Sequence, residues 1–340
     1  MSNRPATAQD YKDFTMSFLN PRAGFLAFVI LASAVTLAAQ TPAPGQTTPI
    51  PRTVKLNLIV TDASNQSITD FNKEDLQLLE DDTPQTLTLF EKDTRPVRYV
   101  VAIDTSGSFK DLLAPVLEGT KILINSNRDL DETMLLRFIS SDKIETVEKF
   151  TSDKAKLVGV LPKLGIEGGQ SAVIDALYLA VQTVAEYKAG DNSARRVVVL
   201  FSDGEDRASY YTSDDLLKLL RGADVQVFVV GIVALLDREH GLIRPSPKQK
   251  AEKLLNMIAS ESGGRVFFPA HVRGLADALT EINKDLQTQF LIGYESTNQD
   301  PKKNFRKVRA KVVTMGKKST AIVRSGYFLH PPDGDKKKKK

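Results

Sequence analysis

The sequence predicts an α/β protein in which a doubly wound, mostly parallel sheet is joined to a small antiparallel β-sandwich. Between residues 96 and 289, short apolar runs rich in β-branched residues alternate with helical patterns. Strands of this kind, buried on both faces and separated by helices, are typical of a parallel sheet covered on both sides. Segments 53–95 and 290–330 instead show the alternating polar and apolar pattern of half-buried strands. We therefore expect the sandwich to be formed by these N- and C-terminal flanking segments.

The composition is that of an ordinary globular protein and excludes several classes of function. The chain has 340 residues, of which 41% are hydrophobic and 26% charged. The formal net charge of +4 is more than accounted for by the five lysines at 336–340, so the charge does not indicate a nucleic-acid partner. Cysteine is absent, which excludes disulfides, thiol catalysis, Cys-ligated zinc and a lipoprotein anchor. The three histidines are scattered without metal-ligand spacing.

The amino terminus resembles an export signal, interpreted most simply from an internal start at Met16. An apolar run at 23–37 follows Arg22, and Ala38 and Ala39 offer small residues for cleavage. The run is shorter than the ~20 apolar residues of a spanning helix, which favours a cleaved signal over a membrane anchor. We therefore expect residues 1–39 to be a signal-peptide region and the protein to be periplasmic or secreted. An uncleaved segment that anchors the protein to the membrane is the alternative.

The folded part is expected to begin after a linker. Residues 40–52 are rich in Pro and Thr and lack periodicity, as expected of an extended linker. Strands are then predicted at 54–60 and 76–80, and again at 290–294, 305–313 and 321–323. Each β segment alone is too small to bury a core, so we expect 53–95 and 290–330 to pair with each other. Residues 331–340 are predicted to be a basic disordered tail.

The central region, 96–289, alternates between strands and helices. Buried strands are predicted at 99–103, 134–139, 197–201 and 225–233. Helices are predicted at 112–124, 172–187, 212–220, 248–262 and 275–286. This order implies a parallel sheet with helices on both faces.

Oxygen-bearing side chains follow the predicted strands at the point where ligands gather in an open α/β sheet. The first buried strand ends in Asp104, and Ser106 and Ser108 come directly after it. Ser171 stands at the start of the helix at 172–187, and Asp203 follows the strand at 197–201. The carboxyl ends of parallel strands meet at one edge of the sheet, and oxygen is the donor that Mg²⁺, Mn²⁺ and Ca²⁺ prefer. The sequence therefore predicts a site for a hard divalent cation.

The three loops together resemble the metal-ion-dependent adhesion site of von Willebrand factor type A domains. The matching elements are Asp-x-Ser-x-Ser at 104–108, a hydroxyl residue four positions before Asp-Ala-Leu at 175–177, and Ser-Asp-Gly at 202–204. The resemblance covers roughly residues 97–286 and implies a Rossmann-like fold. It also implies that Asp104, Ser106, Ser108, Ser171 and Asp203 hold the ion. Ser171 stands where threonine is usual, but it keeps the hydroxyl. The flanking β segments further resemble a group of exported bacterial proteins that carry this domain.

The resemblance also implies a function. In the family, a partner's Glu or Asp completes the coordination of the ion, so the domain binds proteins without catalysis. Mg²⁺ is the expected ion, with Mn²⁺ or Ca²⁺ as alternatives. We thus expect an exported adhesion or binding module with a protein partner, no nucleic acid and no small-molecule substrate. In some relatives the last helix shifts between two states, and here that helix is the one at 275–286.

Several neighbouring residues have simpler interpretations. Asp175 lies in the first turn of a helix, where a carboxylate commonly complements the helix dipole. Glu205 and Asp206 are expected to belong to a solvated turn.

Two other functions remain open. The protein is either a structural or chaperone-like envelope scaffold in which the metal only stabilises the fold, or, less favoured, a metal-dependent hydrolase. A phosphatase of the haloacid-dehalogenase type needs a carboxylate two residues after the strand-end aspartate, and Ser106 stands there instead. A Gly-x-Ser-x-Gly elbow is also missing around Ser106 and Ser108.

Overall fold

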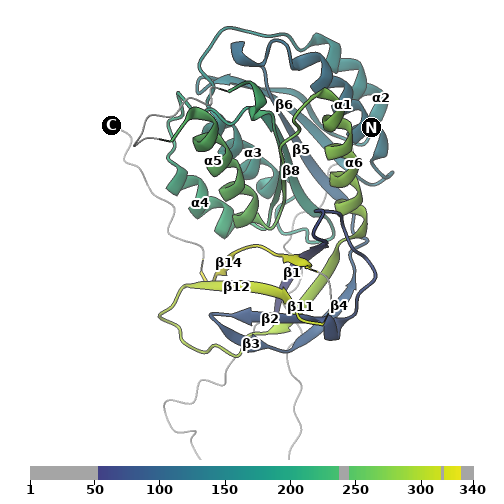
Figure 1. The fold of residues 1–340 in the computed structure, drawn as a ribbon, viewed down its shortest axis with the longest axis vertical. Coiled ribbons are helices and arrows are strands. Elements are labelled where there is room, and N and C mark those ends of the chain that lie inside the picture. The colour runs from purple at the N-terminus through teal and green to yellow at the C-terminus, as the bar shows by residue number, and fades with distance from the viewer. Residues whose placement is uncertain (1–52, 237–244, 315–317, 331–340) are drawn as a thin grey trace, which may run out of the picture. The chain divides into compact units, whose positions relative to one another are not determined.

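In the computed structural model, the central region forms one six-stranded sheet between two layers of helices (Figure 1). The structure describes residues 53–236, 245–314 and 318–330, and these belong to one compact unit. The predicted signal region, linker and basic tail lie outside the described residues. Within the described part of the chain, no helix is long and apolar enough to cross a membrane.

The sheet is parallel except at one edge. Its strand order is β10-β9-β8-β5-β6-β7, and only β7 runs antiparallel to its neighbour. The strands are β5 (Val97–Asp104), β6 (Glu132–Ser140), β7 (Lys143–Thr151), β8 (Arg195–Ser202), β9 (Gln226–Gly231) and β10 (Val266–Phe267). All eight residues of β5 are buried, because the strand lies in the middle of the sheet and is covered on both faces.

Three helices cover each face of the sheet. On one face lie α1 (Leu113–Ser126), α2 (Lys154–Val160) and α6 (Val272–Thr288), which pack on Val101 and Ile103 of β5. On the other face lie α3 (Val173–Glu186), α4 (Ser213–Gly222) and α5 (Pro247–Ser262), which pack on Val100 and Ala102. Because successive side chains of β5 point to opposite faces of the sheet, the strand contributes to both apolar cores. Helices α1 and α6 approach closely at Gly119, where a Cβ would lie 2.5 Å from Leu279 Cδ1.

The two flanking segments form an antiparallel sandwich, as the fold class predicted. One sheet has the order β13-β1-β11-β4 and the other β14-β12-β2-β3. The first contains β1 (Thr53–Thr61), β4 (Leu87–Lys92), β11 (Phe290–Glu295) and β13 (Thr320–Ile322); the second contains β2 (Leu76–Glu80), β3 (Thr83–Gln85), β12 (Phe305–Val312) and β14 (Gly326–Phe328). Strands β1 and β11 pair with Leu56 opposite Ile292, and β12 pairs with β2 with Ala310 opposite Leu78. Each sheet thus contains strands from both ends of the folded chain, which share one apolar core.

Some elements of the central region were not predicted, among them β7, α2 and the two-residue strand β10. Strand β7 was missed because its sequence is mostly polar and no residue in it is buried, as befits the edge of a sheet. Helix α2 was missed because it has only seven residues, and only Leu157 in it is buried. The strand predicted at 225–233 ends at Gly231, and a 3-10 turn at Val233–Leu235 follows it.

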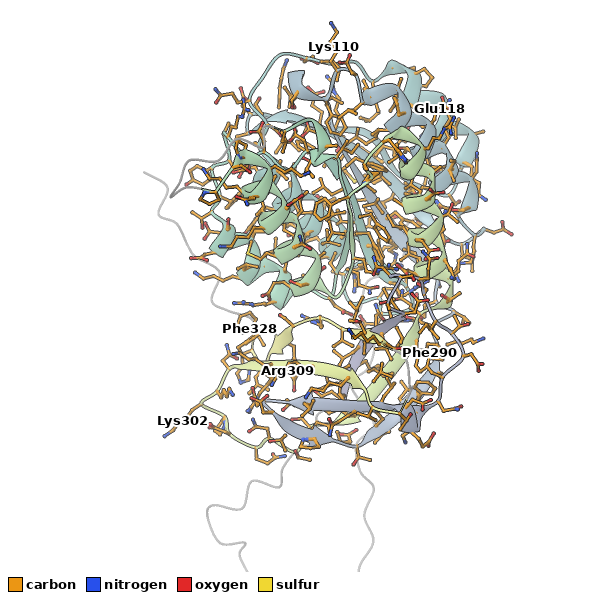
Figure 2. The ribbon with its side chains drawn as sticks, viewed as in Figure 1. Lys110, Glu118, Phe290, Lys302, Arg309 and Phe328 are labelled. Carbon is orange, nitrogen blue, oxygen red and sulfur yellow. The ribbon has the colours of Figure 1, made fainter. Side chains whose placement is uncertain are left out.

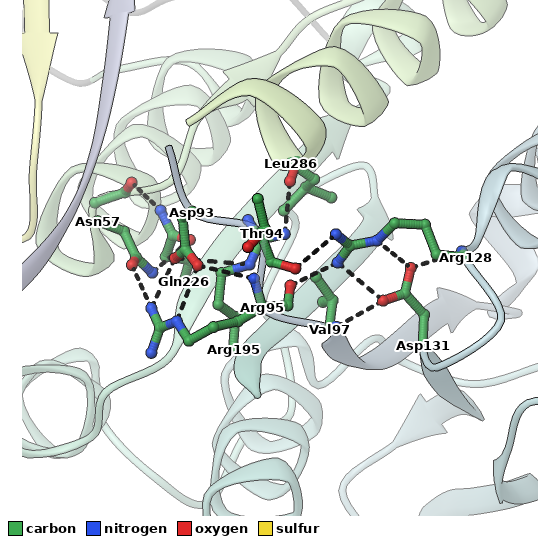
Figure 3. A network of polar contacts seen from close by, with 11 residues as sticks. Asn57, Asp93, Thr94, Arg95, Val97, Arg128, Asp131, Arg195, Gln226 and Leu286 are labelled. Atoms are coloured by element: carbon green, nitrogen blue, oxygen red, sulfur yellow. Dashed lines mark hydrogen bonds and ion pairs between the residues drawn. The ribbon is translucent and has the colours of Figure 1, made fainter. Parts of the chain in front are cut away.

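A buried polar network joins the first sandwich sheet to the α/β region (Figure 3). Arg95 donates to both carboxylate oxygens of the buried Asp93, at 2.9 and 2.7 Å, and to Asn57 Oδ1 at 3.1 Å. Asn57 in turn donates to Gln226 Oε1 at 3.0 Å, while the buried Arg195 lies 3.8 Å from Asp93. Buried charges need such partners, so the network holds β1 of the sandwich against β9 of the central sheet.

A single buried carboxylate also ties the two sandwich sheets together. Glu80 on β2 accepts hydrogen bonds from Tyr294 Oη at 2.6 Å, Ser296 Oγ at 2.7 Å and Tyr327 Oη at 2.8 Å. Burial and the bond to Glu80 raise the pKa of Tyr327 to about 12, and they also raise the pKa of Tyr294. Both phenols therefore stay protonated and act as donors at neutral pH.

We predict that Tyr294→Phe lowers the free energy of unfolding by about 2 kcal/mol, because it removes one donor from a buried carboxylate. Urea denaturation measures this change. The slope with denaturant should stay that of the unmodified protein, since the core around the ring is kept. An unchanged midpoint would show that the Tyr294 hydroxyl is not needed by Glu80.

Candidate metal centre

The site begins with Asp104, the last residue of β5, which is fully buried. Its Oδ1 accepts a hydrogen bond from the backbone N–H of Ser106 at 3.0 Å, which turns the chain back over the strand end. The Oγ atoms of Ser106 and Ser108 lie 3.3 Å apart. Phe109, fully buried in the core below, anchors this loop. The first loop therefore brings one carboxylate and two hydroxyls together.

The second oxygen of Asp104 connects this loop to the other two. Asp104 Oδ2 accepts from Ser171 Oγ at 3.0 Å and from Ser202 Oγ at 3.1 Å. Ser171 lies just before α3, and Ser202 is the last residue of β8, the strand beside β5. All of these groups are buried. The three loops thus meet at a single carboxylate.

Asp203 adds a second buried carboxylate on the neighbouring strand end. Its Oδ1 accepts from Glu205 N at 3.0 Å, and only 3% of the residue is exposed. The next residue, Gly204, has φ +78°, and a Cβ there would lie about 3 Å from Leu255 and Ala251 of α5. Glycine is required at this position both by the left-handed backbone and by the close approach of α5. The loop is therefore held with Asp203 at the strand end.

The electrostatics of the site favour a bound cation. Burial, together with the negative charge of Asp203, raises the pKa of Asp104 to about 6 against the opposing hydrogen bonds from Ser106 and Ser171. Neither carboxylate forms an ion pair with a Lys, Arg or His of the described chain. Two buried carboxylates without a counter-charge are costly, and a divalent cation would remove that cost. The residues present therefore fit such an ion.

The donor set also indicates which kind of ion fits. Among the described residues, no cluster of three or more His, Cys, Asp or Glu side chains has metal-binding geometry. The site offers two carboxylates and several hydroxyls instead. Hard cations that keep part of their water shell suit such a set better than ions that prefer nitrogen or sulfur.

The structure brings the five predicted residues to one rim of the sheet. Asp104 bonds directly to Ser171 and to the backbone of Ser106, while Ser106 contacts Ser108. Asp203 forms no hydrogen bond with Asp104, but its negative charge contributes to the raised pKa of Asp104. Ser202 was missed as a member of the site, although its position directly before Asp203 on a buried strand could have indicated it. It orients Asp104 and accepts from Gly204 N at 3.0 Å.

Asp175 lies in the first turn of α3, as expected, and has a second role as well. Its side chain is buried and accepts from the backbone N–H groups of Tyr210 and Tyr211, at 2.7 and 2.8 Å, and from Ser141 Oγ. It therefore organises the loop after β8, in addition to any interaction with the dipole of α3.

Asp206 is likewise more than part of a solvated turn. Its Oδ1 accepts from Ile174 N at the start of α3, at 3.1 Å, and from Ser209 Oγ at 2.5 Å. Asp175 and Asp206 together lock the third loop onto the helix that follows the second loop. Ser171, at the entrance to that helix, is positioned by the same arrangement, because its carbonyl accepts from Arg207 N at 2.9 Å.

The model of the von Willebrand factor type A domain matches residues 100–283, which is more than half of the chain and includes all three loops. The chain belongs to this family. Domains of the family are often metal-dependent and take part in protein interaction. No curated protein matches the chain.

Several solved structures resemble the chain at low identity. An aerotolerance-related membrane protein from Bacteroides fragilis is 20% identical, with 55% of this chain and 99% of that chain covered and a TM-score of 0.42. A von Willebrand factor type A protein from Catenulispora acidiphila is 16% identical, with coverages of 71% and 51% and a TM-score of 0.43. Proximal thread matrix protein 1 from the mussel byssus, with a zinc-occupied MIDAS motif, is 18% identical, with coverages of 62% and 50% and a TM-score of 0.45.

We predict that Asp175→Ala loosens the third loop without unfolding the domain. Two backbone N–H groups lose their buried acceptor, which should lower the free energy of unfolding by about 2 kcal/mol. Hydrogen exchange at the amides of Tyr210 and Tyr211 should accelerate, while exchange in β5 follows only the global loss. Asp214→Ala, an exposed carboxylate in the first turn of α4, is the matched control. Equal exchange in the two variants would contradict the proposed role of Asp175.

Proposed function

We propose that this protein is a non-enzymatic binding module that takes up an acidic residue of a partner protein through a divalent cation, with Mg²⁺ as the expected ion. The observation that supports this most strongly is the pair of buried carboxylates, Asp104 and Asp203, which lack a cationic partner among the described residues. They lie at the carboxyl edge of the parallel sheet, where ligands of α/β domains bind. Membership of a family that takes part in protein interaction supports the same function.

In this proposal five side chains hold the ion: Asp104, Ser106, Ser108, Ser171 and Asp203. The cation, when bound, supplies the positive charge to which a carboxylate of the partner binds. Serine hydroxyls are neutral ligands, so this set compensates the charge of the ion less than a cage of carboxylates would. Ser202 keeps one oxygen of Asp104 in place by donating to it. The chain itself thus preorganises the ligands and leaves a role for an acidic group from outside.

The proposal includes the location and organisation of the chain. We propose that residues 1–39 direct export and that 40–52 separate this segment from the folded body. We also propose a division into a β segment at 53–95, the type A domain at 96–289 and a β segment at 290–330. In this division the metal-binding rim lies at the end of the type A domain away from the sandwich. This arrangement is supported by Asn57 of β1, which donates to Gln226 at the start of β9, whereas Asp104 and Ser202 are the last residues of the parallel strands β5 and β8.

We predict that Asp104→Ala abolishes both the stabilisation by Mg²⁺ and the capture of a partner. At an Mg²⁺ concentration 100 times the dissociation constant, binding to the folded state stabilises by about 2.7 kcal/mol, and the variant should lose this gain. Thermal unfolding with Mg²⁺ and with chelator measures the first effect. A pull-down from the source organism's envelope, with and without chelator, measures the second.

Each outcome of that experiment distinguishes between functions. Asp214→Ala should retain both effects, because this carboxylate is exposed on α4. Partner capture that persists in chelator would favour a scaffold in which the metal is only stabilising. Turnover of phosphate esters that is lost in Asp104→Asn would favour a hydrolase.

We predict that Asp203→Asn changes stability in opposite directions with and without the ion. In chelator, the substitution removes the repulsion between two buried carboxylates and should raise the free energy of unfolding by about 1 kcal/mol. With Mg²⁺ in excess, it should lower stability relative to the unmodified protein, because one charged ligand is lost. The amide oxygen can still accept the bond from Glu205 N, so the loop is kept. A decrease of the same size in both conditions would argue against a cation between these side chains.

A further inference from the structure

A row of cations lies on the outer face of β12, in the sandwich and away from the candidate metal centre. Lys307, Arg309 and Lys311 are exposed, while Val308 and Ala310 between them pack against the sandwich core. Alternate residues of a strand point to the same face at a spacing of about 7 Å, so three positive charges follow one another in a straight line. Figure 2 shows Arg309, at the middle of this row, on β12.

The row lines a groove of about 810 Å³. Its opposite wall contains Arg221 and Glu261, from α4 and α5, while Phe305 belongs to β12 itself and lies two residues before Lys307. Arg221 is already engaged, because its guanidinium donates to Glu261 at 2.9 and 3.1 Å and lies 5.1 Å from the centre of the Phe305 ring. A groove of this size is within the range of pockets that bind ligands.

Two aspartates in the turn between β2 and β3 already neutralise some of the positive charge on and beside β12. Asp82 forms an ion pair with Arg309, and Asp81 pairs with Lys303 at 2.7 Å. Lys307 and Lys311, on either side of Arg309, form no ion pair within the described part of the chain. Arg309, in the middle of the row, thus already binds a carboxylate. Lys307 and Lys311, at the two ends, can each bind another one.

We propose that this groove binds an extended acidic segment of a partner protein, with Lys307 and Lys311 each receiving one carboxylate. The two lysines are four residues apart on a strand, which places their Cα atoms about 13 Å apart. An extended peptide with acidic residues at positions i and i+4 presents its carboxylates on one face at the same distance. The match in charge and spacing defines the partner segment. This surface is separate from the metal centre and does not depend on its function.

Fluorescence anisotropy of a labelled peptide tests the proposal. The probe is Gly-Glu-Thr-Val-Thr-Glu-Gly, and chelator is present throughout so that a cation-dependent site cannot contribute. We expect saturable binding to the full chain that weakens with added salt. Lys307→Gln combined with Lys311→Gln should weaken binding about tenfold, because two exposed charge pairs are lost. The matched control, Lys92→Gln with Lys163→Gln, removes the same charge at two exposed positions outside the groove and should bind as the unmodified protein does.

Three results would overturn the proposal. The first is equal binding by the two double variants, which would show that only the net charge of the protein matters and not the position of the lysines. The second is equal affinity for Gly-Thr-Glu-Glu-Val-Thr-Gly, in which the adjacent glutamates point to opposite faces of an extended chain. The third is binding of polyphosphate, or of vesicles made of equal parts phosphatidylcholine and phosphatidylglycerol, without binding of the peptide. The thermal unfolding of both double variants should be unchanged, since all four side chains are exposed.

Discussion

The structure depends on keeping two carboxylates, Asp104 and Asp203, out of water at the ends of neighbouring parallel strands. Burying like charges together costs free energy, and the raised pKa of Asp104 reflects that cost. The chain reduces the cost with hydroxyl donors: Ser171 and Ser202 bond to one oxygen of Asp104, and the backbone of Ser106 bonds to the other. These bonds fix the carboxylate without neutralising it. The site thereby remains a preorganised source of negative charge, which is what an electropositive ligand requires.

The rigidity of this arrangement comes from the elements that surround it. All eight residues of β5 are buried, and the loops are tied to one another and not only to their own strands. Asp175, at the start of α3, holds the backbone of Tyr210 and Tyr211, while Asp206 holds the N-terminus of the same helix. Helix α6 is held in a comparable way near its C-terminal end. There the buried Asp285 pairs with Arg265 at 2.6 Å and accepts from Ser67, and Arg265 also donates to the carbonyl of Asn65 in the sandwich. Since α6 continues within two residues into β11, the sandwich and the last helix form one connected unit.

The sequence could predict the elements whose pattern is set by burial. The runs that became β5, β8 and β9 are apolar because both faces of the sheet are covered, and the three loops were found because Asp104 and Asp203 follow such runs directly. Strand β7 could not be found in the same way, because an edge strand with no buried residue has no apolar pattern. The role of Asp175 was also not predictable from local sequence. Its partners Tyr210 and Tyr211 lie 35 and 36 residues away, and only the fold brings them together. The contribution of Ser202 was visible in principle, but a serine inside a buried strand is ambiguous until its neighbour across the sheet is known.

Charge helps to determine which strands from the two ends of the folded chain pair with each other. Segment 53–95 has nine acidic and four basic residues, whereas 290–330 has two acidic and nine basic residues. Hydrophobic burial provides the driving force for the sandwich, but it does not select which strand lies beside β2. The acidic turn after β2 meets the basic strand β12, where Asp81 contacts Arg306 at 3.5 Å and Asp82 pairs with Arg309. Complementary charge therefore favours the observed register over one in which like charges are opposed. The basic segment has more charge than this pairing uses, and part of the surplus, Lys307 and Lys311, lies on the exposed face of β12. A strand kept only for pairing with β2 would not need it, so the excess is better explained by a contact outside the fold.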